Sequence, residues 1–427
     1  MFPSRTLYHL SASPARAGPH GMEIRPVTSE EFPEFVRVVD AAAGLHVTDD
    51  GVAAAREGYD LARTLAAFDG SRIVGGTGSD VLHLTLPGSV MAPVARVKGT
   101  GVLPTHRRRG VLTALMARLL EDARRLGQSL SILYAAEGGI FGRFGYGPAA
   151  FAVGVKIDRA HTSLASSMLP SARVRLLGDA EAGDLLPALF DDHRRTQPGQ
   201  VERPAHFWRT WLEDGERLRR GAGPRFVALC EDAAGWPAGY VSYRFTGGYP
   251  PTTARDLVVE DLVAVTAEAR AALWSYCLNI DLVGAIRCTN TPVDEPLRWM
   301  LTDPRRLEVT GVRDFLWLRL VDVPAALQTR RYPTAGGIVL DVADDVCPDN
   351  AGRYLLEAAL DGAECRRTDR PAELALGVTE LSVAYLGGVR LATLARAGRV
   401  SELSRGALGR ADELFAWEPA PWTVTDW

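Results

Sequence analysis

The stretch Val102-Leu-Pro-Thr-His-Arg-Arg-Arg-Gly-Val-Leu-Thr113 decides how the first third of the chain folds. Before it, apolar residues alternate with others over residues 94–102, as they do in a strand. After it, leucines and a methionine recur at helical spacing through to Leu126. The pattern predicts a strand, a short basic turn and an amphipathic helix.

The basic turn lies where the predicted helix begins. The first turn of a helix has unpaired N–H groups and a partial positive charge, so it binds anions. Arginines add forked donors that suit phosphate, and a glycine lets a pyrophosphate approach the backbone closely. We therefore expect a diphosphate to be held here. The residues expected to hold it are Arg107, Arg108, Arg109, Gly110, Val111, Leu112 and Thr113.

Two familiar phosphate-binding signatures are absent from the sequence. No Lys-Ser or Lys-Thr pair follows a glycine-rich loop, and no G-x-G-x-x-G follows a first strand. What remains is Arg-x-x-Gly after a strand. This pattern resembles the GNAT acetyltransferases, which hold the pyrophosphate of acetyl-CoA in this way. A surface helix with a solvated arginine cluster is the competing interpretation.

A second block strengthens that resemblance. It reads Ala136-Glu-Gly-Gly-Ile-Phe-Gly-Arg-Phe-Gly-Tyr-Gly-Pro148. Together with the basic turn it closely resembles the Eis (enhanced intracellular survival) family of multi-acetylating aminoglycoside N-acetyltransferases. The resemblance covers about residues 22–427. Three later stretches that look like the family are Phe315-Leu-Trp-Leu-Arg-Leu-Val-Asp-Val-Pro-Ala-Ala-Leu327, Tyr385-Leu-Gly-Gly-Val389, and Pro421-Trp422 with Asp426-Trp427.

The resemblance implies an α/β (α+β) fold of tandem GNAT modules followed by a sterol-carrier-like domain. We predict a disordered extension over 1–21, a catalytic GNAT module over 22–165, a second GNAT module over 166–318 and the sterol-carrier-like domain over 319–427. The second module's counterpart of the basic turn reads Val265-Thr-Ala-Glu-Ala-Arg270. Because an acid stands where phosphate would bind, we expect this module to be a degenerate copy without acetyl-CoA.

Local patterns predict the elements of each part. In the first module they are helices near 30–43 and 51–63 with a cap at Thr48, a hairpin around Asp69-Gly70, and strands over 81–86, 130–134 and 149–157. In the second they are a helix around Trp208, a hairpin of 225–229 with 239–243, a strand over 257–265 and a helix over 267–279. In the third they are strands from Gly337 and Gly352 and helices near 378–386 and 391–397.

Composition excludes several classes of protein. The 427 residues are 47% hydrophobic and 23% charged, with a net charge of −4, as in soluble globular proteins. That balance gives no reason to expect nucleic acid or a membrane surface as a partner. No apolar run approaches the roughly 20 residues of a membrane span. The five cysteines are odd in number and lack CxxC pairs, so we expect reduced thiols in a cytoplasmic protein and no metal site.

Acetyl transfer from a thioester to an amine requires an anchored cofactor. The strand residues Thr100, Gly101 and Val102 are expected to offer backbone groups to the pantetheine arm of acetyl-CoA, from a sheet that opens at this point. By resemblance, Ala136 and Glu137 also line the cofactor. For Glu137 a helix cap or an exposed acid is the alternative.

The resemblance also implies how protons are moved. In the Eis family the proposed general base is the C-terminal carboxylate, which carries over to Trp427, because the apolar tail 422–427 gains burial by docking. A frayed end is the alternative. The family's proposed general acid is a tyrosine, but Phe141 stands at its position and has no proton to give. Tyr134, Tyr146 or water could serve instead.

The resemblance further implies an aminoglycoside, or another polar cationic amine, as acceptor and a homo-oligomer, a hexamer in the family. Candidate acids for attracting such a cation are Asp49, Asp50 and Asp426. A non-catalytic acetyl-CoA-binding sensor or scaffold is the alternative function, and Phe141 favours it. The sterol-carrier-like domain could carry lipid, or could only pack and deliver the C-terminus, which is the interpretation that we favour.

Overall fold

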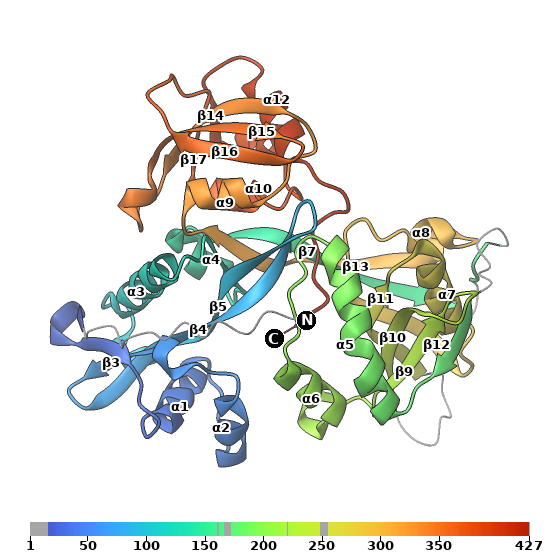
Figure 1. The fold of residues 1–427 in the computed structure, drawn as a ribbon. Helices are drawn as coiled ribbons and strands as arrows, with labels where there is room; N and C mark the ends of the chain where they lie inside the picture. Colours follow the sequence, from blue (N-terminus) through green and yellow to red (C-terminus); the bar gives the residue numbers. More distant parts are fainter. Residues whose placement is uncertain (1–15, 160–161, 166–171, 220, 248–254, 427) are drawn as a thin grey trace.

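The structure, a computed structural model, describes residues 16–159, 162–165, 172–219, 221–247 and 255–426. They form a mixed 13-stranded sheet with helices on both faces and a separate five-stranded sheet (Figure 1). The strand order of the large sheet is β1-β2-β3-β4-β5-β6-β13-β7-β12-β11-β10-β9-β8. In the part of the chain that the structure describes, no helix is long and apolar enough to cross a membrane.

The first half of the large sheet has one core on each face. Successive residues of a strand point to opposite faces, and β3 (Thr64–Asp69) shows this clearly. Phe68 belongs to the core beneath α1 (Phe32–Ala42), whereas its neighbour Ala67 belongs to the core beneath α3 (Val111–Arg125). The other elements of this half are β1 (Arg16–Ala17), η1 (Pro19–Gly21), β2 (Glu23–Pro26), α2 (Asp49–Arg56), η2 (Leu61–Arg63), β4 (Arg72–Leu86), β5 (Val90–Val102), η3 (Pro104–His106), β6 (Leu130–Leu133), α4 (Gly138–Phe141), η4 (Gly142–Phe144) and β7 (Gly147–Asp158).

The predicted second helix is shorter than the sequence suggests. It begins as predicted, with the Thr48 side chain accepting a hydrogen bond from the Gly51 N–H at 3.2 Å. It ends at Arg56, and the prediction that it continues to residue 63 is wrong. The Asp60 carboxylate accepts from the Ala62 N–H at 3.0 Å and starts the short 3-10 turn η2 instead.

The predicted disordered extension is also too long. Residues 1–15 lie outside the described residues, but Arg16–Ala17 pairs with β2 at the edge of the sheet, and Pro19–Gly21 forms a 3-10 turn. The prediction is therefore wrong for residues 16–21. The edge of β2 offers unpaired backbone groups, and this short segment satisfies them.

The second half of the sheet repeats the two-faced arrangement. Tyr240 belongs to the core beneath α5 (Asp179–Thr196) and α6 (Ala205–Glu213), whereas its neighbour Val241 belongs to the core beneath α7 (Ala267–Leu278). The predicted hairpin, strand and helices of this half are all present. Its other elements are β8 (Arg173–Leu176), η7 (Glu216–Arg219), β9 (Phe226–Glu231), β10 (Pro237–Thr246), β11 (Arg255–Ala264), β12 (Val283–Thr291), α8 (Leu297–Met300), η8 (Pro304–Arg306) and β13 (Leu307–Leu320).

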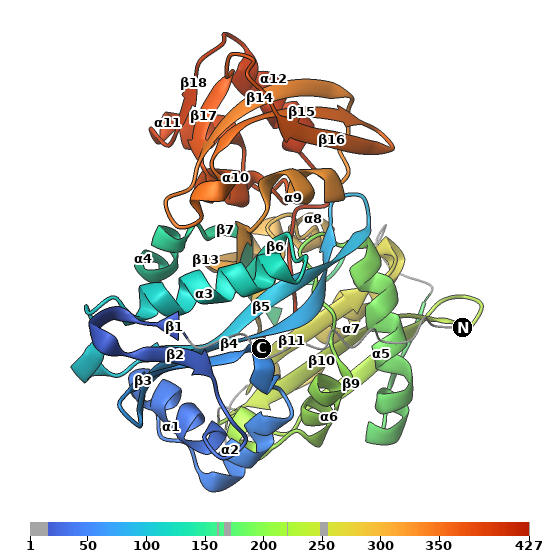
Figure 2. The ribbon, with the colours of Figure 1, turned by 60° about the vertical axis from the view of Figure 1, so that its left-hand side comes forward.

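Strand β13 joins the two halves into one sheet. It is antiparallel to β6 from Trp317 to Leu320, and antiparallel to β7 along most of its length. A strand that belongs to the second half in sequence therefore lies inside the sheet of the first half. Figure 2 shows the two halves with their helices on either side of the shared sheet.

The third part of the chain packs against the first. In Figure 2 its five-stranded sheet lies above α9 and α10, which face the large sheet. The fully buried side chains of Leu340 and Leu356 share one core with Leu84 of β4 and Leu318 of β13, so this part is packed onto the large sheet through apolar contacts. Its elements are α9 (Val323–Thr329), β14 (Gly336–Ala343), η9 (Pro348–Asn350), β15 (Gly352–Ala359), β16 (Gly362–Arg367), β17 (Leu374–Gly377), α10 (Val378–Ala384), α11 (Leu391–Arg396), β18 (Val400–Glu402) and α12 (Ala407–Phe415).

A buried arginine ties this third part to the loop after α4. The guanidinium of Arg319 donates to Asp344 Oδ2 at 2.7 Å and also to the carbonyl of Phe144. Its side chain is fully buried. Gly145 lies directly against this guanidinium with a φ of 82°, a conformation that glycine adopts without steric cost.

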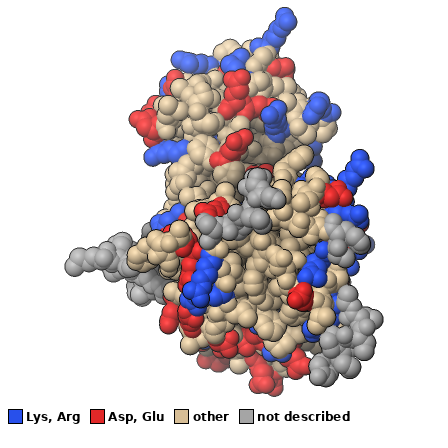
Figure 3. All heavy atoms as spheres, turned by 90° about the vertical axis from the view of Figure 1, so that its right-hand side faces the viewer, with Lys and Arg blue, Asp and Glu red and all other residues tan. Residues whose placement is uncertain are grey.

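The molecular surface carries charges of both signs. Figure 3 shows one face, on which basic and acidic side chains are interspersed and acidic ones gather toward the lower edge. This distribution matches the net charge of −4. Basic and acidic side chains are thus mixed on the face that this view shows.

We expect Gly145→Ala to destabilise the protein strongly. The new methyl group would collide with the Arg319 guanidinium, and the positive φ would add strain. Disturbing a buried ion pair costs about 3–5 kcal/mol, so the midpoint of thermal unfolding should fall by several degrees. Gly142→Ala is the matched control, because no heavy atom stands within 4 Å of the position of its new methyl group. Equal midpoints for the two variants would contradict this account.

Candidate active site

Strands β5 and β6 part toward their carboxyl ends. They pair in parallel over only two residues of each strand, 95–96 and 131–132. Beyond this point β5 continues to Val102 paired with β4, while β6 ends at Leu133. The sheet therefore opens between the two strands at the place where the sequence predicted an opening.

Thr100, Gly101 and Val102 border one side of this opening. The Thr100 hydroxyl lies 2.7 Å from the hydroxyl of Thr77 in β4. Gly101 packs so closely against α1 that a Cβ atom there would stand 2.8 Å from the Cβ of Ala42. In the described residues no strand pairs with the opposite edge of this end of β5. The backbone groups along that edge can therefore bind an extended ligand arm.

Arg107 fixes the basic turn that follows β5. Its Nε donates to the carbonyl of Val102 at 3.2 Å, and its Nη2 donates to the carbonyl of Ala42 at 2.7 Å. The guanidinium therefore joins the turn to the end of α1. Its observed contacts are with these carbonyls, so its contribution to an anion site is to hold the turn in place.

The first turn of α3 is uncapped and faces solvent. Gly110, the residue before the first turn, has a φ of 79°. As a glycine, it has no side chain that could cap the first N–H groups of the helix. Arg108 adopts the left-handed conformation as well, with a φ of 61°. Of the residues predicted to bind pyrophosphate, Val111 is buried, Leu112 is half-buried, and Arg108, Arg109, Gly110 and Thr113 are exposed. Free N–H groups beside exposed arginines are what a phosphate group requires.

Ala136 and Glu137 lie beyond the end of β6, on the other side of the opening, and both are exposed. Glu137 precedes α4, but its side chain makes no capping hydrogen bond. The interpretation of Glu137 as a helix cap is therefore wrong. It is an exposed acid beside the opening.

Phe141 and Tyr146 belong to the core under α3. Phe141 is 7% exposed and packs edge-on against Tyr146, with 6.3 Å between the ring centroids. The hydroxyl of Tyr146 is 2.7 Å from Ser131 Oγ, and burial raises its pKa to about 12. Tyr146 is thus held in the interior as a structural residue.

Tyr134 differs from Tyr146 because it stands at the opening itself, directly after β6. Its hydroxyl donates a hydrogen bond to the carbonyl of Thr425 in the C-terminal tail. Its ring packs against Phe315 with 4.6 Å between centroids. Burial, followed by the nearby charge of Asp426, raises the pKa of Tyr134 well above its usual value. The hydroxyl therefore keeps its proton at neutral pH.

The C-terminal tail is docked between the two halves of the sheet. Residues 421–425 are buried, so the alternative of a frayed end is wrong for them, while Asp426 is exposed and Trp427 lies outside the described residues. The indole of Trp422 donates to Asn290 Oδ1 at 2.7 Å, and the Asn290 amide donates to the carbonyl of Thr423 at 3.0 Å. The tail thus runs from the second half to Tyr134 in the first.

A cluster of buried charges lies on β4 and β5, before the end of β5 that borders the opening. Asp80 accepts hydrogen bonds from Arg96 at 2.9 Å and from Lys98 at 2.7 Å. Burial acts to raise the pKa of the Asp80 carboxyl, but these two cations outweigh it and hold the pKa below its usual range. Burial, and then the charge of Arg96, lowers the pKa of His206 on α6, so α6 faces this cluster from the second half. No three His, Cys, Asp or Glu residues group as metal ligands in the described ranges.

The acids predicted to attract a cationic acceptor are placed in different ways. Asp49 and Asp50 begin α2 at the surface, and Asp49 accepts from Arg37 at 2.6 Å. Asp426 acts on Tyr134 at the opening. Among these three acids, and within the described residues, Asp426 is the one whose charge acts on a residue of the opening, Tyr134.

In the second half, the helix at the position that corresponds to α3 is capped. At the junction of β11 and α7, the Thr266 side chain accepts from the Ala269 N–H at 3.1 Å and so caps the helix itself. Glu268 lies in the first turn. A self-capped helix with an acid in its first turn disfavours phosphate, which supports the interpretation of this module as a degenerate copy.

Sequence reasoning missed the residues that hold the tail, among them Gln200, Arg203 and Asn290. The Gln200 side-chain oxygen accepts from the Val424 N–H at 3.3 Å, and Arg203 Nε donates to Thr425 Oγ1 at 3.0 Å. These polar residues have no distinctive spacing. They lie more than 130 residues from their partners along the chain, so no local pattern could have revealed them.

Family models match all three parts of the chain. Two GNAT acetyltransferase domain models match residues 23–149 and 199–320, and a sterol carrier protein domain model matches 323–424. The predicted fold class, two GNAT modules and a sterol-carrier-like domain, is therefore confirmed. GNAT domains of this kind use acetyl-CoA, and the uncapped helix and open strand edge of the first module fit that cofactor.

Individual relatives match over most of their length. An uncharacterized N-acetyltransferase of Streptomyces coelicolor is 37% identical, over 94% of this chain and 98% of its own. The N-acetyltransferase Eis of Mycobacterium tuberculosis is 36% identical, over 83% of this chain and 88% of its own. The crystal structure of Eis1 from Mycobacterium abscessus superposes with a TM-score of 0.84 and 35% identity, covering 95% of this chain and 100% of that one. The chain therefore belongs to the Eis family of GNAT N-acetyltransferases.

Proposed function

We propose that the first module transfers the acetyl group of acetyl-CoA to a primary amine of a polar cationic small molecule, of the aminoglycoside class, by direct attack in a ternary complex. One observation carries this proposal: the β5–β6 opening ends at an uncapped helix N-terminus with three exposed arginines, of which Arg107 bonds to backbone carbonyls. At the corresponding β11–α7 junction of the second module, Thr266 caps the helix. The first module is accordingly the proposed catalytic one.

The residues around the opening divide the binding of acetyl-CoA among them. The backbone of 110–113, with Arg108 and Arg109, would hold the pyrophosphate, while Arg107 keeps the turn in place. The free edge of 100–102 would bind the pantetheine arm, with Ala136 and Glu137 opposite. When bound, the cofactor supplies a thioester whose carbonyl carbon accepts the amine.

Two proton transfers accompany this step. The amine loses a proton as the C–N bond forms, and the departing thiolate gains one as the C–S bond breaks. We assign the first to the α-carboxylate of Trp427, toward which the buried tail leads, and the second to Tyr134. Tyr134 stands at the opening, whereas Phe141 has no hydroxyl and Tyr146 lies in the core under α3.

The acceptor and the assembly are proposed from the resemblance to the family. An aminoglycoside carries several ammonium groups, and Asp426 and Glu137 are exposed acids beside the opening that could attract one. Assembly as a homo-oligomer, a hexamer by resemblance, and a cytoplasmic location are proposed on the same basis. A panel of primary amines with acetyl-CoA, followed by thiol release and product mass, tests the acceptor class.

The second candidate is a non-catalytic protein that binds acetyl-CoA as a sensor or scaffold. Phe141 favours it, because the residue at this position is buried and has no acidic proton. Binding of acetyl-CoA without turnover of any amine in the panel would support this function. Turnover of any amine that is comparable to that of family enzymes would exclude it.

Gly110→Asp should weaken acetyl-CoA binding by about 10²-fold or more. A carboxylate about 4 Å from a phosphate repels it by about 4 kcal/mol at a protein surface before screening by salt. Gly110→Asn is the matched control, since asparagine has the same shape and tolerates the same φ without the charge. Calorimetry that finds equal affinities for the two variants would remove the helix N-terminus from the site.

Extending the chain by two glycines after Trp427 should lower kcat while leaving the affinity for acetyl-CoA within twofold. The extension displaces the α-carboxylate, and a positioned base contributes about 10²–10⁴ in rate. Circular dichroism and the dissociation constant of acetyl-CoA serve as controls. Full turnover by the extended protein would exclude the carboxylate from the mechanism.

Tyr134→Phe should lower kcat by about 10²-fold, because it removes the proton donor at the opening. Tyr146→Phe removes a buried hydroxyl from the core and should lower thermal stability slightly, with kcat nearly unchanged. Measuring both parameters for both variants separates the two roles. If kcat is unaffected in both, water reprotonates the thiolate.

A further inference from the structure

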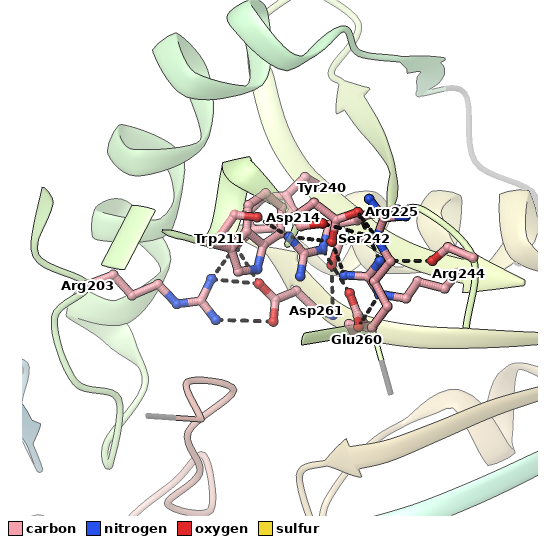
Figure 4. A network of polar contacts seen from close by, with 11 residues as sticks. Arg203, Trp211, Asp214, Arg225, Tyr240, Ser242, Arg244, Glu260 and Asp261 are labelled. Carbon is pink, nitrogen blue, oxygen red and sulfur yellow. Dashed lines mark hydrogen bonds and ion pairs between the residues drawn. The ribbon is translucent and has the colours of Figure 1, made fainter. Parts of the chain in front are cut away.

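The guanidinium of Arg203 is buried beside the tail and is fixed by several hydrogen bonds. It lies in the segment between α5 and α6, and 1% of its side chain is exposed. Its Nη1 and Nη2 donate to the two carboxylate oxygens of Asp261 on β11, at 2.6 and 3.1 Å (Figure 4). Nη1 also donates to the hydroxyl of Tyr240 at 3.1 Å. A forked pair of this geometry fixes the plane of the guanidinium.

Aromatic rings limit the remaining freedom of this guanidinium. Its carbon is 4.4 Å from the ring centroid of Phe190, 4.8 Å from that of Phe207 and 5.2 Å from that of Trp208. A cation over aromatic faces is attracted to them, and the rings exclude water from the ion pair. Arg203 is thus rigid in position as well as in orientation.

The one donor that Arg203 directs away from the second module is Nε. It donates to Thr425 Oγ1 at 3.0 Å. Thr425 in turn accepts the hydroxyl of Tyr134 on its carbonyl oxygen. This one tail residue is therefore held from the second module by Arg203 and from the first by Tyr134.

The site that holds the tail is the second module's own strand opening. Strands β11 and β12 pair in parallel only as far as Val259 and Cys288. Beyond that point Asp261 of β11 binds Arg203, and Asn290 of β12 binds Trp422 and Thr423. In the first module the corresponding opening is the proposed place of the pantetheine arm. The second module fills its opening with the tail of its own chain.

We propose that Arg203 is a positioning residue for acetyl transfer: by holding Thr425 it sets where the residues after Thr425, and the carboxylates they carry, meet the acceptor amine. The degenerate module thereby contributes to catalysis as the support for the tail, without binding a cofactor. This inference rests on the proposed function of the tail carboxylate. Arg203 itself touches neither reactant.

Thr425→Val tests the inference with little change in shape, because it removes the acceptor for Arg203 Nε and leaves the buried volume in place. We expect kcat to fall at least tenfold, KM for acetyl-CoA to stay within twofold, and the acidic limb of the kcat–pH profile, which reports the base, to shift. Thr425→Ser keeps the hydroxyl and should restore kcat to within about threefold. Thr291→Val is the matched control, because it removes another buried threonine hydroxyl, which donates to the carbonyl of Val153.

Arg203→Lys provides a second test. Lysine keeps the charge for Asp261 but cannot also present Nε to Thr425, so we expect the same loss of kcat in a protein that circular dichroism shows to be folded. Wild-type kcat in Thr425→Val, combined with an inactive glycine-extended protein, would overturn this inference and leave the proposed function intact. Full activity of the extended protein would instead overturn the proposed role of the carboxylate. If Thr291→Val loses as much kcat as Thr425→Val, the effect is one of general packing and the inference fails.

Discussion

The pairing of β13 with both β6 and β7 is the constraint on which the rest of the structure depends. Because β13 separates these two strands, the first module's sheet is complete only when a strand from residues 307–320 is inserted. The insertion makes one sheet of two modules and fixes the distance between their openings. It also places Phe315 beside Tyr134, so the strand that joins the modules helps to position the residue proposed as proton donor. A hinge between the modules would break both relations.

The sequence was most informative where the physics is local. Helix α3 was predictable because its leucines repeat at 3.6-residue spacing, and the position of Gly110 and the arginines at the helix start was predictable from the same pattern. The replacement of the family's tyrosine by Phe141 could also be found from the sequence, since it is a change within one motif. The insertion of β13 and the contacts of Arg203 could not, because strand partners and buried ion pairs are chosen by the whole fold. The end of α2 was missed because a single Asp60 side chain starts the next turn.

Buried arginines recur where parts of the molecule meet. Arg203 joins the second module to the tail, and Arg319 joins the third part to the loop after α4. A third buried arginine, Arg244, lies within the second half, where it pairs with Glu260 at 2.6 Å and with Asp214 in the network of Figure 4. A buried ion pair adds little net stability compared with apolar packing, but removing one partner costs about 3–5 kcal/mol. These pairs therefore specify one arrangement of the parts more than they raise the overall stability.

The docking of the tail has a consequence for the order of events during synthesis. A ribosome produces the first module long before residues 422–425, yet those residues fill the second module's opening and meet Tyr134. Contacts so distant in sequence form late, because the loop between them must first be closed. A nascent chain of which only the first 320 residues have been released can form the strands of the large sheet, but it lacks every contact that the tail makes with Tyr134 and Asn290. Docking of the tail is therefore among the last steps in the folding of the chain.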